Sequence, residues 1–384
     1  MTDVFEIASS ARLRMGEIGG LSAALARKGQ PFRIGGAGPL QAGPGEFEAL
    51  TSGSMGKPRH IRRTMASWIA SFAVNAGLFG IAPGARVAVL GGLEQSLSLY
   101  GAIEALHLGA DLYALAGLRP DRQRWALAKG AVEVLYTTPA QTRLMVEAGG
   151  PELSALQVIV MGGSKLDDTL RAAVRALAPK ARLREFYGAA ETSFISLAGP
   201  GDPPSSVGRP FPGVEIEIRE VRDQVGEVWV RSPYLFAGYA GGYAGGYAGG
   251  DAGGDADLVR WHDGWLSLAE KGRMAEGCLY LAGRAGRMVT VADHNVFPEE
   301  IEVYLMGLKG VERAAVLPRP DGLRGVHLVA VLRGDAGQER AILDALRGAL
   351  GPTKAPKAVI WLEDWPTLPS GKTDLAALAQ RVGR

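Results

Sequence analysis

The chain has 384 residues, 47% of them hydrophobic, so it is long enough for two domains with large buried cores. Its 42 basic residues nearly balance 40 acidic ones, and the resulting net charge of +2 gives no reason to expect nucleic acid or an anionic membrane as a partner. The single cysteine, Cys278, excludes an internal disulfide and a cysteine-based metal site; we expect a small buried side chain.

The N-terminal residues 1–20 mix acidic and basic side chains without a continuous apolar run. They lack the pattern of a secretory signal, so we expect the protein in the cytoplasm. The longest mostly apolar stretch, residues 67–82, is interrupted by Asn75 and two glycines and is too short to span a bilayer. We predict a helix of the core there, and no membrane partner.

The most informative stretch is residues 51–58, which read Thr-Ser-Gly-Ser-Met-Gly-Lys-Pro. Glycines let backbone N–H groups approach phosphate oxygens, while hydroxyls and a lysine add donors and positive charge. The stretch is not a P-loop, because only two residues separate Gly53 from Gly56 and Pro58 follows Lys57. By itself the composition is also typical of a surface turn, so other segments must decide.

Downstream of residue 86, short apolar runs alternate with longer helical patterns. The predicted strands are residues 86–90, 132–136 and 156–161, and the predicted helices are residues 96–108 and 167–177. This alternation predicts an α/β domain with a largely parallel sheet. Residues 205–235 instead indicate strands joined by turns.

A four-residue repeat of Tyr-Ala-Gly-Gly type occupies residues 238–256. Its period is far below that of solenoid repeats, and it contains almost nothing to bury. We predict a flexible low-complexity loop. An aromatic platform formed by Tyr239, Tyr243 and Tyr247 is the less favoured alternative.

From about residue 285 the pattern becomes a compact α+β one. The predicted helices are residues 298–308 and 338–350, and the predicted strands are residues 314–317 and 327–332. We predict a separate domain over residues 285–384, called the lid below. Gly286 is a plausible hinge, since glycine accepts large backbone rotations.

Several further motifs follow the glycine-rich stretch in a fixed order. They occupy residues 161–164, 186–192, 226–230, 263–265, 283–287, 295–302 and 368–372. Together with residues 51–58 they resemble the adenylate-forming superfamily of acyl-CoA and aryl-CoA synthetases, nonribosomal adenylation domains and luciferases. The resemblance extends from residue 51 nearly to the C-terminus. It implies an α/β adenylate-forming fold, with a truncated core over residues 1–284 (a parallel-sheet subdomain plus a small β subdomain) and a mobile α+β lid over residues 285–384.

The resemblance also implies a two-step reaction. A carboxylic acid attacks the α-phosphate of ATP to give an acyl-adenylate, and a thiol then displaces AMP. The expected cofactors are ATP, Mg²⁺ and CoA, or a carrier-protein phosphopantetheine in place of CoA. Both steps need charge neutralised at phosphorus, which calls for phosphate donors, a metal ligand and a mobile cation.

Site residues are carried over by matching each motif. The phosphate-binding candidates are Thr51, Ser52, Gly53, Ser54, Gly56 and Lys57. The candidates lining the adenine and acyl sides are Gly162, Gly163, Ser164, Tyr187, Gly188 and Ala189, with Tyr187 stacked on the adenine. Glu191 is expected to bind Mg²⁺, Glu270 the ribose hydroxyls, and Arg284 the ribose and phosphate region. Lys372 is the catalytic candidate that bridges the carboxylate and the α-phosphate, with Glu191 as its catalytic companion.

The sequence departs from the family pattern in several places. Only about 50 residues precede the glycine-rich stretch, so we expect a trimmed core. Met55 and Ala190 stand where threonines are usual, and Glu270 stands where aspartate is usual. Residues 292–295 lack the glycines that flank the thiol tunnel of family ligases, which puts the CoA step in more doubt than adenylation.

The first functional hypothesis is therefore an AMP-forming acid:thiol ligase acting on an aromatic or medium apolar acid, as a 4-coumarate-CoA ligase-like enzyme does. The candidate acid-pocket residues are Trp68, Phe72, Gly163, Phe194 and Ile195. One alternative is an adenylating enzyme that loads an acyl carrier protein. Another is a non-catalytic regulatory paralogue, which the presence of Lys57, Glu191 and Lys372 argues against. A Rossmann dehydrogenase is disfavoured, since no Gly-X-Gly-X-X-Gly opens a helix after a predicted strand.

Overall fold

The computed structural model describes residues 3–51, 59–222, 224–240, 259–291, 294–321, 325–368 and 372–383. Two predicted features fall mainly outside these ranges. The phosphate-binding candidates Ser52, Gly53, Ser54, Gly56 and Lys57 lie outside the described residues, and so do residues 241–258, which hold most of the repeat.

An eight-stranded sheet forms the core and runs in the order β1-β6-β5-β7-β8-β9-β10-β11. Its strands are β1 (Arg12–Met15), β5 (Arg86–Val89), β6 (Asp111–Ala114), β7 (Val134–Thr137), β8 (Val158–Met161), β9 (Arg182–Ala189), β10 (Ser193–Ala198) and β11 (Arg209–Pro210). All pairings from β1 to β9 are parallel, and the last two are antiparallel. The predicted parallel-sheet subdomain is thereby confirmed.

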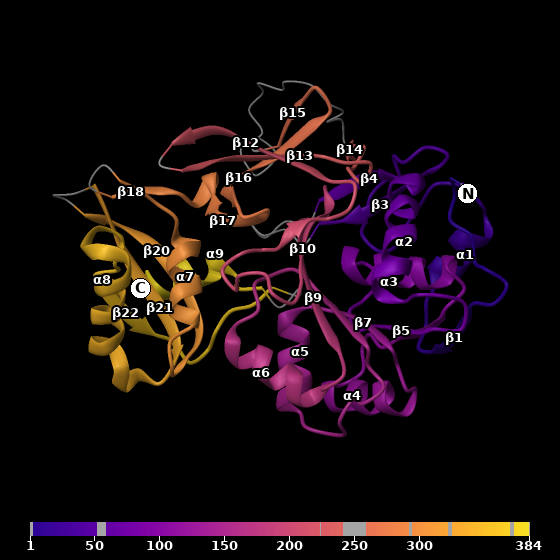
Figure 1. Ribbon diagram of the computed structural model, residues 1–384, viewed down its shortest axis with the longest axis horizontal. Helices are drawn as coiled ribbons and strands as arrows, with labels where there is room; N and C mark the ends of the chain where they lie inside the picture. The colour runs from indigo at the N-terminus through magenta and orange to yellow at the C-terminus, as the bar shows by residue number, and fades with distance from the viewer. Residues whose placement is uncertain are drawn as a thin grey trace.

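Helices cover both faces of this sheet (Figure 1). They are α2 (Met65–Phe79), α3 (Ser96–His107), α4 (Pro120–Lys129), α5 (Pro139–Glu147) and α6 (Asp168–Leu177). Alternate residues of one strand serve the two faces: Tyr136 packs in a cluster with α2 and α3, and Leu135 packs in a cluster with α4 and α6. Near-continuous apolar strands such as Val158–Met161 follow from burial on both faces.

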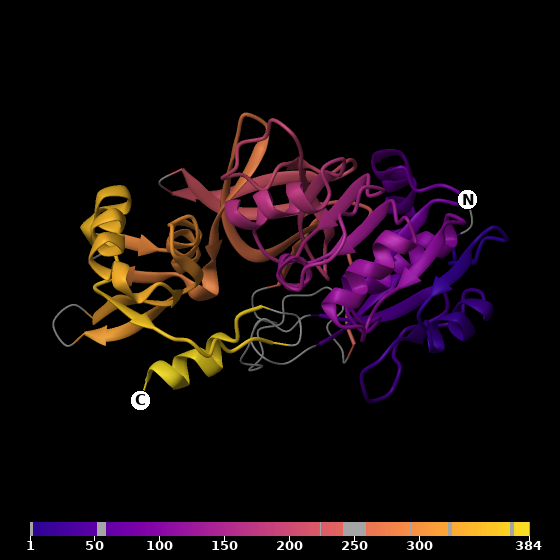
Figure 2. The same cartoon turned by 90° about the horizontal axis from the view of Figure 1, so that it is seen from below.

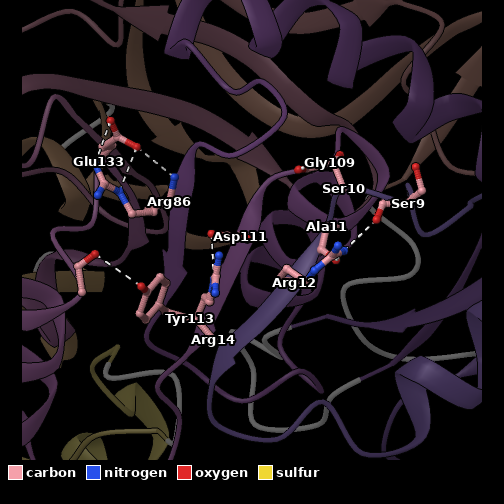
Figure 3. Close-up of polar contacts among 11 residues, drawn as sticks. Ser9, Ser10, Ala11, Arg12, Arg14, Arg86, Gly109, Asp111, Tyr113 and Glu133 are labelled. Atoms are coloured by element: carbon pink, nitrogen blue, oxygen red, sulfur yellow. Dashed lines mark hydrogen bonds and ion pairs between the residues drawn. The ribbon is translucent and has the colours of Figure 1, made fainter.

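The N-terminal segment, for which the sequence predicted no structure, joins the edge of this sheet. Strand β1 pairs in parallel with β6, and Arg14 Nε donates to Asp111 Oδ2 at 2.8 Å (Figure 3). Ser10 Oγ donates to the carbonyl of Gly109 at 3.1 Å, as the same figure shows. On the inner side Phe5 is 1% exposed and stacks on Phe72. The short segment thus supplies both an edge strand and a ring of the core.

Two smaller sheets form the β region at the top of Figure 1. The first has the order β12-β13-β16-β15, with β17 paired to β16, and the second has the order β14-β4-β3-β2. Their strands are β2 (Phe32–Arg33), β3 (Glu46–Leu50), β4 (His60–Thr64), β12 (Glu215–Arg222), β13 (Val225–Arg231), β14 (Gly238–Tyr239), β15 (Arg260–His262), β16 (Trp265–Ala275) and β17 (Cys278–Arg284); a short helix, α1 (Gly20–Ala26), precedes them. Cys278 is fully buried, as predicted.

The residues after Arg284 form a separate apolar cluster, which includes one face of a three-stranded sheet ordered β20-β21-β22. The elements are η2 (Ala285–Arg287), β18 (Val289–Val291), β19 (His294–Val296), α7 (Pro298–Met306), β20 (Val311–Asp321), β21 (Gly325–Gly334), η3 (Ala336–Gln338), α8 (Glu339–Lys354), β22 (Ala358–Trp361) and α9 (Leu375–Val382). The predicted smaller α+β C-terminal part is confirmed. The exact boundary at residue 284 stays a prediction, although β17 ends there.

A buried polar cluster lies between α2, α3 and β7. Glu104 is fully buried, and its Oε1 accepts a hydrogen bond of 2.9 Å from Asn75 Nδ2. Tyr136 donates to the other carboxylate oxygen, and Tyr100 donates to Oε1 at 3.4 Å. Burial raises the pKa of Glu104 to about 8, against 4.5 for an exposed glutamate, while these hydrogen bonds oppose the rise.

We expect the free energy of unfolding to fall as pH rises from about 4.5 to about 8 because of Glu104, since the unfolded chain loses this proton first. The Glu104→Gln variant lacks that loss. Its stability relative to the wild type should therefore increase by roughly 4 kcal/mol between pH 5 and pH 8.5, given about 1.4 kcal/mol per pKa unit. Urea unfolding at both pH values measures this, and parallel pH profiles for the two proteins would contradict it.

In the described parts of the chain, no helix has the length and apolar character needed to cross a bilayer.

Candidate active site

The glycine-rich stretch connects β3 to β4, and its two ends are held together. The N–H of Thr51 donates to the carbonyl of Arg59 at 2.9 Å, and the N–H of Arg59 donates to Thr51 Oγ1 at 3.0 Å. Thr51 therefore closes the base of the loop with its backbone and its hydroxyl. Its own phosphate contact, like those of the residues that follow, remains a prediction.

The second motif leaves the end of β8 at the carboxyl edge of the parallel sheet, the usual place for a ligand in an open α/β sheet. Gly163 has a φ of 101°, which favours glycine, and a Cβ placed there would lie 4.0 Å from Cε of Lys372. At Gly162 a Cβ would come within 2.2 Å of the Phe186 ring. The missing side chains therefore admit an aromatic ring on one side and the catalytic candidate on the other.

The third motif forms the end of β9 and its turn into β10. Gly188 lies against the next strand so closely that a Cβ would stand 1.8 Å from the carbonyl oxygen of Ser193, so only glycine fits. Tyr187 and Ala189 are half-buried on β9, while Ser164 of the preceding loop is exposed. The adenine-contact roles assigned to these residues remain predictions.

Glu191 lies on that turn and is held from two sides. Its carbonyl accepts from the N–H of Phe236 at 2.8 Å, and its Oε1 accepts from the hydroxyl of Tyr239 at 2.9 Å. Beneath it, Arg63 is fully buried and donates to the carbonyl of Ala190. The turn is thereby fixed at a point next to the base of the glycine-rich loop, because β14 pairs with β4.

Glu270 and Arg284 face each other across the β16–β17 pair. Arg284 Nε donates to Glu270 Oε1 at 3.1 Å, whereas Glu270 Oε2 is buried and meets no hydrogen-bond donor among the described residues. Burial raises the pKa of the Glu270 carboxyl, and Arg284 and then Lys372 act against this rise. A buried acceptor of this kind suits the paired hydroxyls of a ribose.

Lys372 comes from the C-terminal part and reaches the core. Figure 2 shows the yellow segment after β22 leaving the C-terminal sheet and running toward the core. The N–H of Leu368 donates to the carbonyl of Lys372 at 2.8 Å, which closes the turn that carries it. Burial lowers the pKa of the Lys372 ammonium, with Arg284 adding to the effect and the carboxylates of Glu270 and Glu191 opposing it. These charges show that the predicted residues from distant motifs converge.

The predicted acid pocket requires a correction. Trp68 and Phe72 are 2% and 1% exposed, and both pack edge-on against Tyr100. Phe194 and Ile195 are each 3% exposed in the same apolar cluster. The prediction that these four side chains line a pocket is wrong, because the core itself fills the space around them. Gly163 is the one member that lies beside Lys372.

Two residues at the site were missed in the sequence. Tyr239 was predicted as part of a flexible loop, yet it forms β14 with Gly238 and is 9% exposed. Arg63 carried a usable signal, since it lies two residues after the fully buried Ile61 on a strand and shares its face. Tyr239 carried none, because the following repeats have the same letters.

Comparison with known proteins places this arrangement in context. Residues 49–240 match the model for the AMP-binding enzyme family, and residues 300–372 match the model for the AMP-binding enzyme C-terminal domain. An uncharacterised acyl-CoA ligase, YhfT of Bacillus subtilis (strain 168), is 32% identical over 336 residues, which are 85% of this chain and 66% of that protein. The chain thus spans just under two thirds of that curated relative's length.

Two solved structures show the same fold. The amide bond synthetase McbA from Marinactinospora thermotolerans superposes with a TM-score of 0.76 at 26% identity, covering 91% of this chain and 72% of that one. The o-succinylbenzoate CoA synthetase MenE from Bacillus subtilis, in complex with ATP and magnesium ion, has a TM-score of 0.71 at 21% identity, covering 85% and 68%. The second likeness concerns the fold alone.

Proposed function

The chain belongs to the family of AMP-binding enzymes, and we propose that it is an AMP-forming ligase that activates a carboxylic acid with ATP and transfers it to the thiol of CoA. One observation carries this proposal: Lys372 of the C-terminal part lies beside Gly163 of the core, where the charges of Glu270 and Glu191 act on its ammonium. An ammonium among two carboxylates and a glycine loop is suited to drawing two anions together.

The nucleotide half of the site follows from Glu270 and Arg284. Glu270 Oε2, which meets no hydrogen-bond donor among the described residues, accepts the ribose hydroxyls, and Arg284, which donates to the other oxygen at 3.1 Å, supplies positive charge for the phosphate region. The glycine-rich loop, closed at its base by Thr51 and Arg59, binds the terminal phosphates.

The metal is Mg²⁺, and the donor set fits it. In the described ranges no three His, Cys, Asp or Glu side chains gather as a metal cluster. Mg²⁺ in nucleotide sites needs only one or two carboxylates, because substrate phosphates and waters complete its shell. Glu191 supplies that carboxylate next to the loop base. The ion, when bound, neutralises phosphate charge.

In the first step a carboxylate oxygen of the acid bonds to the α-phosphorus, and the bond to the bridging oxygen breaks to release pyrophosphate. Lys372 holds both anions against their mutual repulsion, which is the main barrier to their approach. In the second step the thiol sulfur bonds to the acyl carbon, the bond to AMP breaks, and the thiol proton leaves to solvent or buffer. We propose an aromatic or medium apolar acid, because the ring of Phe186 lines Gly162 beside this point.

The test is acid-dependent pyrophosphate release from ATP and Mg²⁺ across aromatic acids, medium-chain aliphatic acids and acetate, with and without CoA. We expect release with the aromatic or medium apolar acids and stimulation by CoA. If none of the tested acids supports pyrophosphate release, adenylation is overturned and a non-catalytic paralogue is favoured. If acetate supports the fastest pyrophosphate release, adenylation stands but the proposed class of aromatic or medium apolar acids is overturned.

A second acceptor is favoured by one specific finding. The likeness to an amide bond synthetase, at a TM-score of 0.76 and 26% identity, makes an amine acceptor the alternative to a thiol. A carrier-protein phosphopantetheine is a third. Separate arms with CoA, with a panel of amines and with a holo-carrier protein decide among them, because the arms yield a thioester in solution, an amide, or an acylated protein.

For the Glu270→Gln variant we expect the KM for ATP to rise about tenfold and kcat to change less, since a ribose contact is made equally before and during reaction. The neutral amide keeps the shape but weakens the pair with Arg284. Steady-state pyrophosphate release at varied ATP measures both constants. Glu276→Gln, an exposed turn residue following the same strand β16, is the control. Equal KM values for the two variants would remove Glu270 from the nucleotide site.

A further inference from the structure

Tyr239 forms a hydrogen bond with Glu191 that was not predicted from the sequence. Its hydroxyl donates to Glu191 Oε1 at 2.9 Å, and the ring is 9% exposed. A phenol carries the proton and an ionised carboxylate can only accept, so Tyr239 is the donor of this pair. The bond is thus one-directional: phenol to carboxylate.

The phenol is itself held in place by its surroundings. The Tyr239 ring packs against Phe236 with centroids 5.2 Å apart, and the Arg59 guanidinium lies 5.4 Å from the ring centroid. The N–H of Ala240 donates to the carbonyl of His60 at 2.9 Å, which continues the pairing of β14 with β4. The hydroxyl is therefore fixed relative to the end of the glycine-rich loop.

We propose that Tyr239 is a positioning residue that orients the Glu191 carboxylate for Mg²⁺. This rests on the proposed function, which makes Glu191 the metal ligand. A carboxylate has two oxygens, and a fixed donor on Oε1 would restrict the carboxylate to one orientation, in which Oε2 could bind the cation. Partners of this kind commonly change metal affinity by about 10-fold or more when removed.

The experiment compares the wild type with Tyr239→Phe, which deletes only the hydroxyl. The first readout does not require turnover. It is the increase in thermal unfolding midpoint on adding ATP, measured over a range of free Mg²⁺ concentrations. The second is pyrophosphate release against free Mg²⁺. We expect the half-saturating Mg²⁺ to rise about 10-fold in both, with kcat at saturating Mg²⁺ within about twofold of the wild type.

The control is Tyr234→Phe, which removes another buried hydroxyl, one that donates to the carbonyl of Pro212 at 2.7 Å and not to Glu191. It should leave the Mg²⁺ requirement unchanged. A double-mutant cycle with Glu191→Gln adds specificity: if Tyr239 acts through that carboxylate, Tyr239→Phe has no further effect in the Glu191→Gln background.

The outcomes separate the two proposals. If the wild type shows Mg²⁺-dependent ATP stabilisation and Tyr239→Phe has the same Mg²⁺ requirement, the positioning role is overturned and the proposed function stands. If Tyr239→Phe alone fails to fold, or loses kcat at every Mg²⁺ concentration, the hydroxyl is structural and the role is again overturned. If the wild type shows neither ATP stabilisation nor pyrophosphate release, the proposed function fails first and takes this role with it.

Discussion

Replacing Lys372 with alanine is expected to lower acid-dependent pyrophosphate release about a thousandfold, the upper range for removing one preorganised charge contact in a transition state. The reason is geometric. Lys372 comes from the C-terminal part yet lies beside Gly163, near the carboxylates of Glu270 and Glu191.

Two comparisons make this result specific. Lys354→Ala removes a lysine of the same part, one that pairs with Glu300 at 2.9 Å on α7, and should leave release unchanged. Supplying a preformed acyl-adenylate with CoA bypasses the first step, so thioester formation by Lys372→Ala should stay within about fivefold of the wild type. A variant that adenylates normally would contradict the assignment of Lys372.

Replacing Arg63 with methionine is expected to cost about 3–5 kcal/mol in the free energy of unfolding, the range for breaking a buried charged network. The guanidinium is fully buried and donates to the carbonyls of Ala190 and Tyr234 and, at 2.7 Å, to Ser193 Oγ. Burial lowers the pKa of Arg63 to about 9, against the pull of the Glu191 carboxylate. Methionine fills the space but leaves these acceptors unsatisfied.

Arg62→Met is the matched control, because the neighbouring side chain points to the other face of β4 and, among the described residues, forms an ion pair with Glu46 at 3.8 Å. Urea unfolding should show a change within about 0.5 kcal/mol for it. Equal losses for the two variants would mean that the turn bearing Glu191 does not depend on Arg63.

Regular elements with strong local signals were predictable from the sequence. Helix α6 begins after Asp167, whose carboxylate caps Leu170 N at 2.9 Å, and the buried strand β8 is continuously apolar. The helix of residues 67–82 and the strands near 86, 132 and 156 were confirmed for the same reason. The N-terminal segment was not predicted, since β1 is a four-residue strand whose partner β6 follows about 100 residues later.

At the site, the motif resemblance pointed to the candidate residues but not to how they are supported. Gly188 and Glu191 could be matched by motif, whereas the proton donor on Glu191 depends on a long-range strand pairing between β14 and β4. The apolar residues Trp68 and Phe194 were misassigned because a buried ring and a pocket ring look alike in a sequence.

The register of β16 with β17 has a mechanical consequence. Arg284 pairs with Glu270 on one side and is the last residue of β17, immediately before η2 and the predicted lid. A nucleotide that binds to this pair therefore contacts Arg284, the residue immediately before the C-terminal part. If the predicted lid rotates as proposed, thermodynamic linkage requires that a partner favouring one lid orientation changes nucleotide affinity by the same factor by which the nucleotide shifts the lid equilibrium.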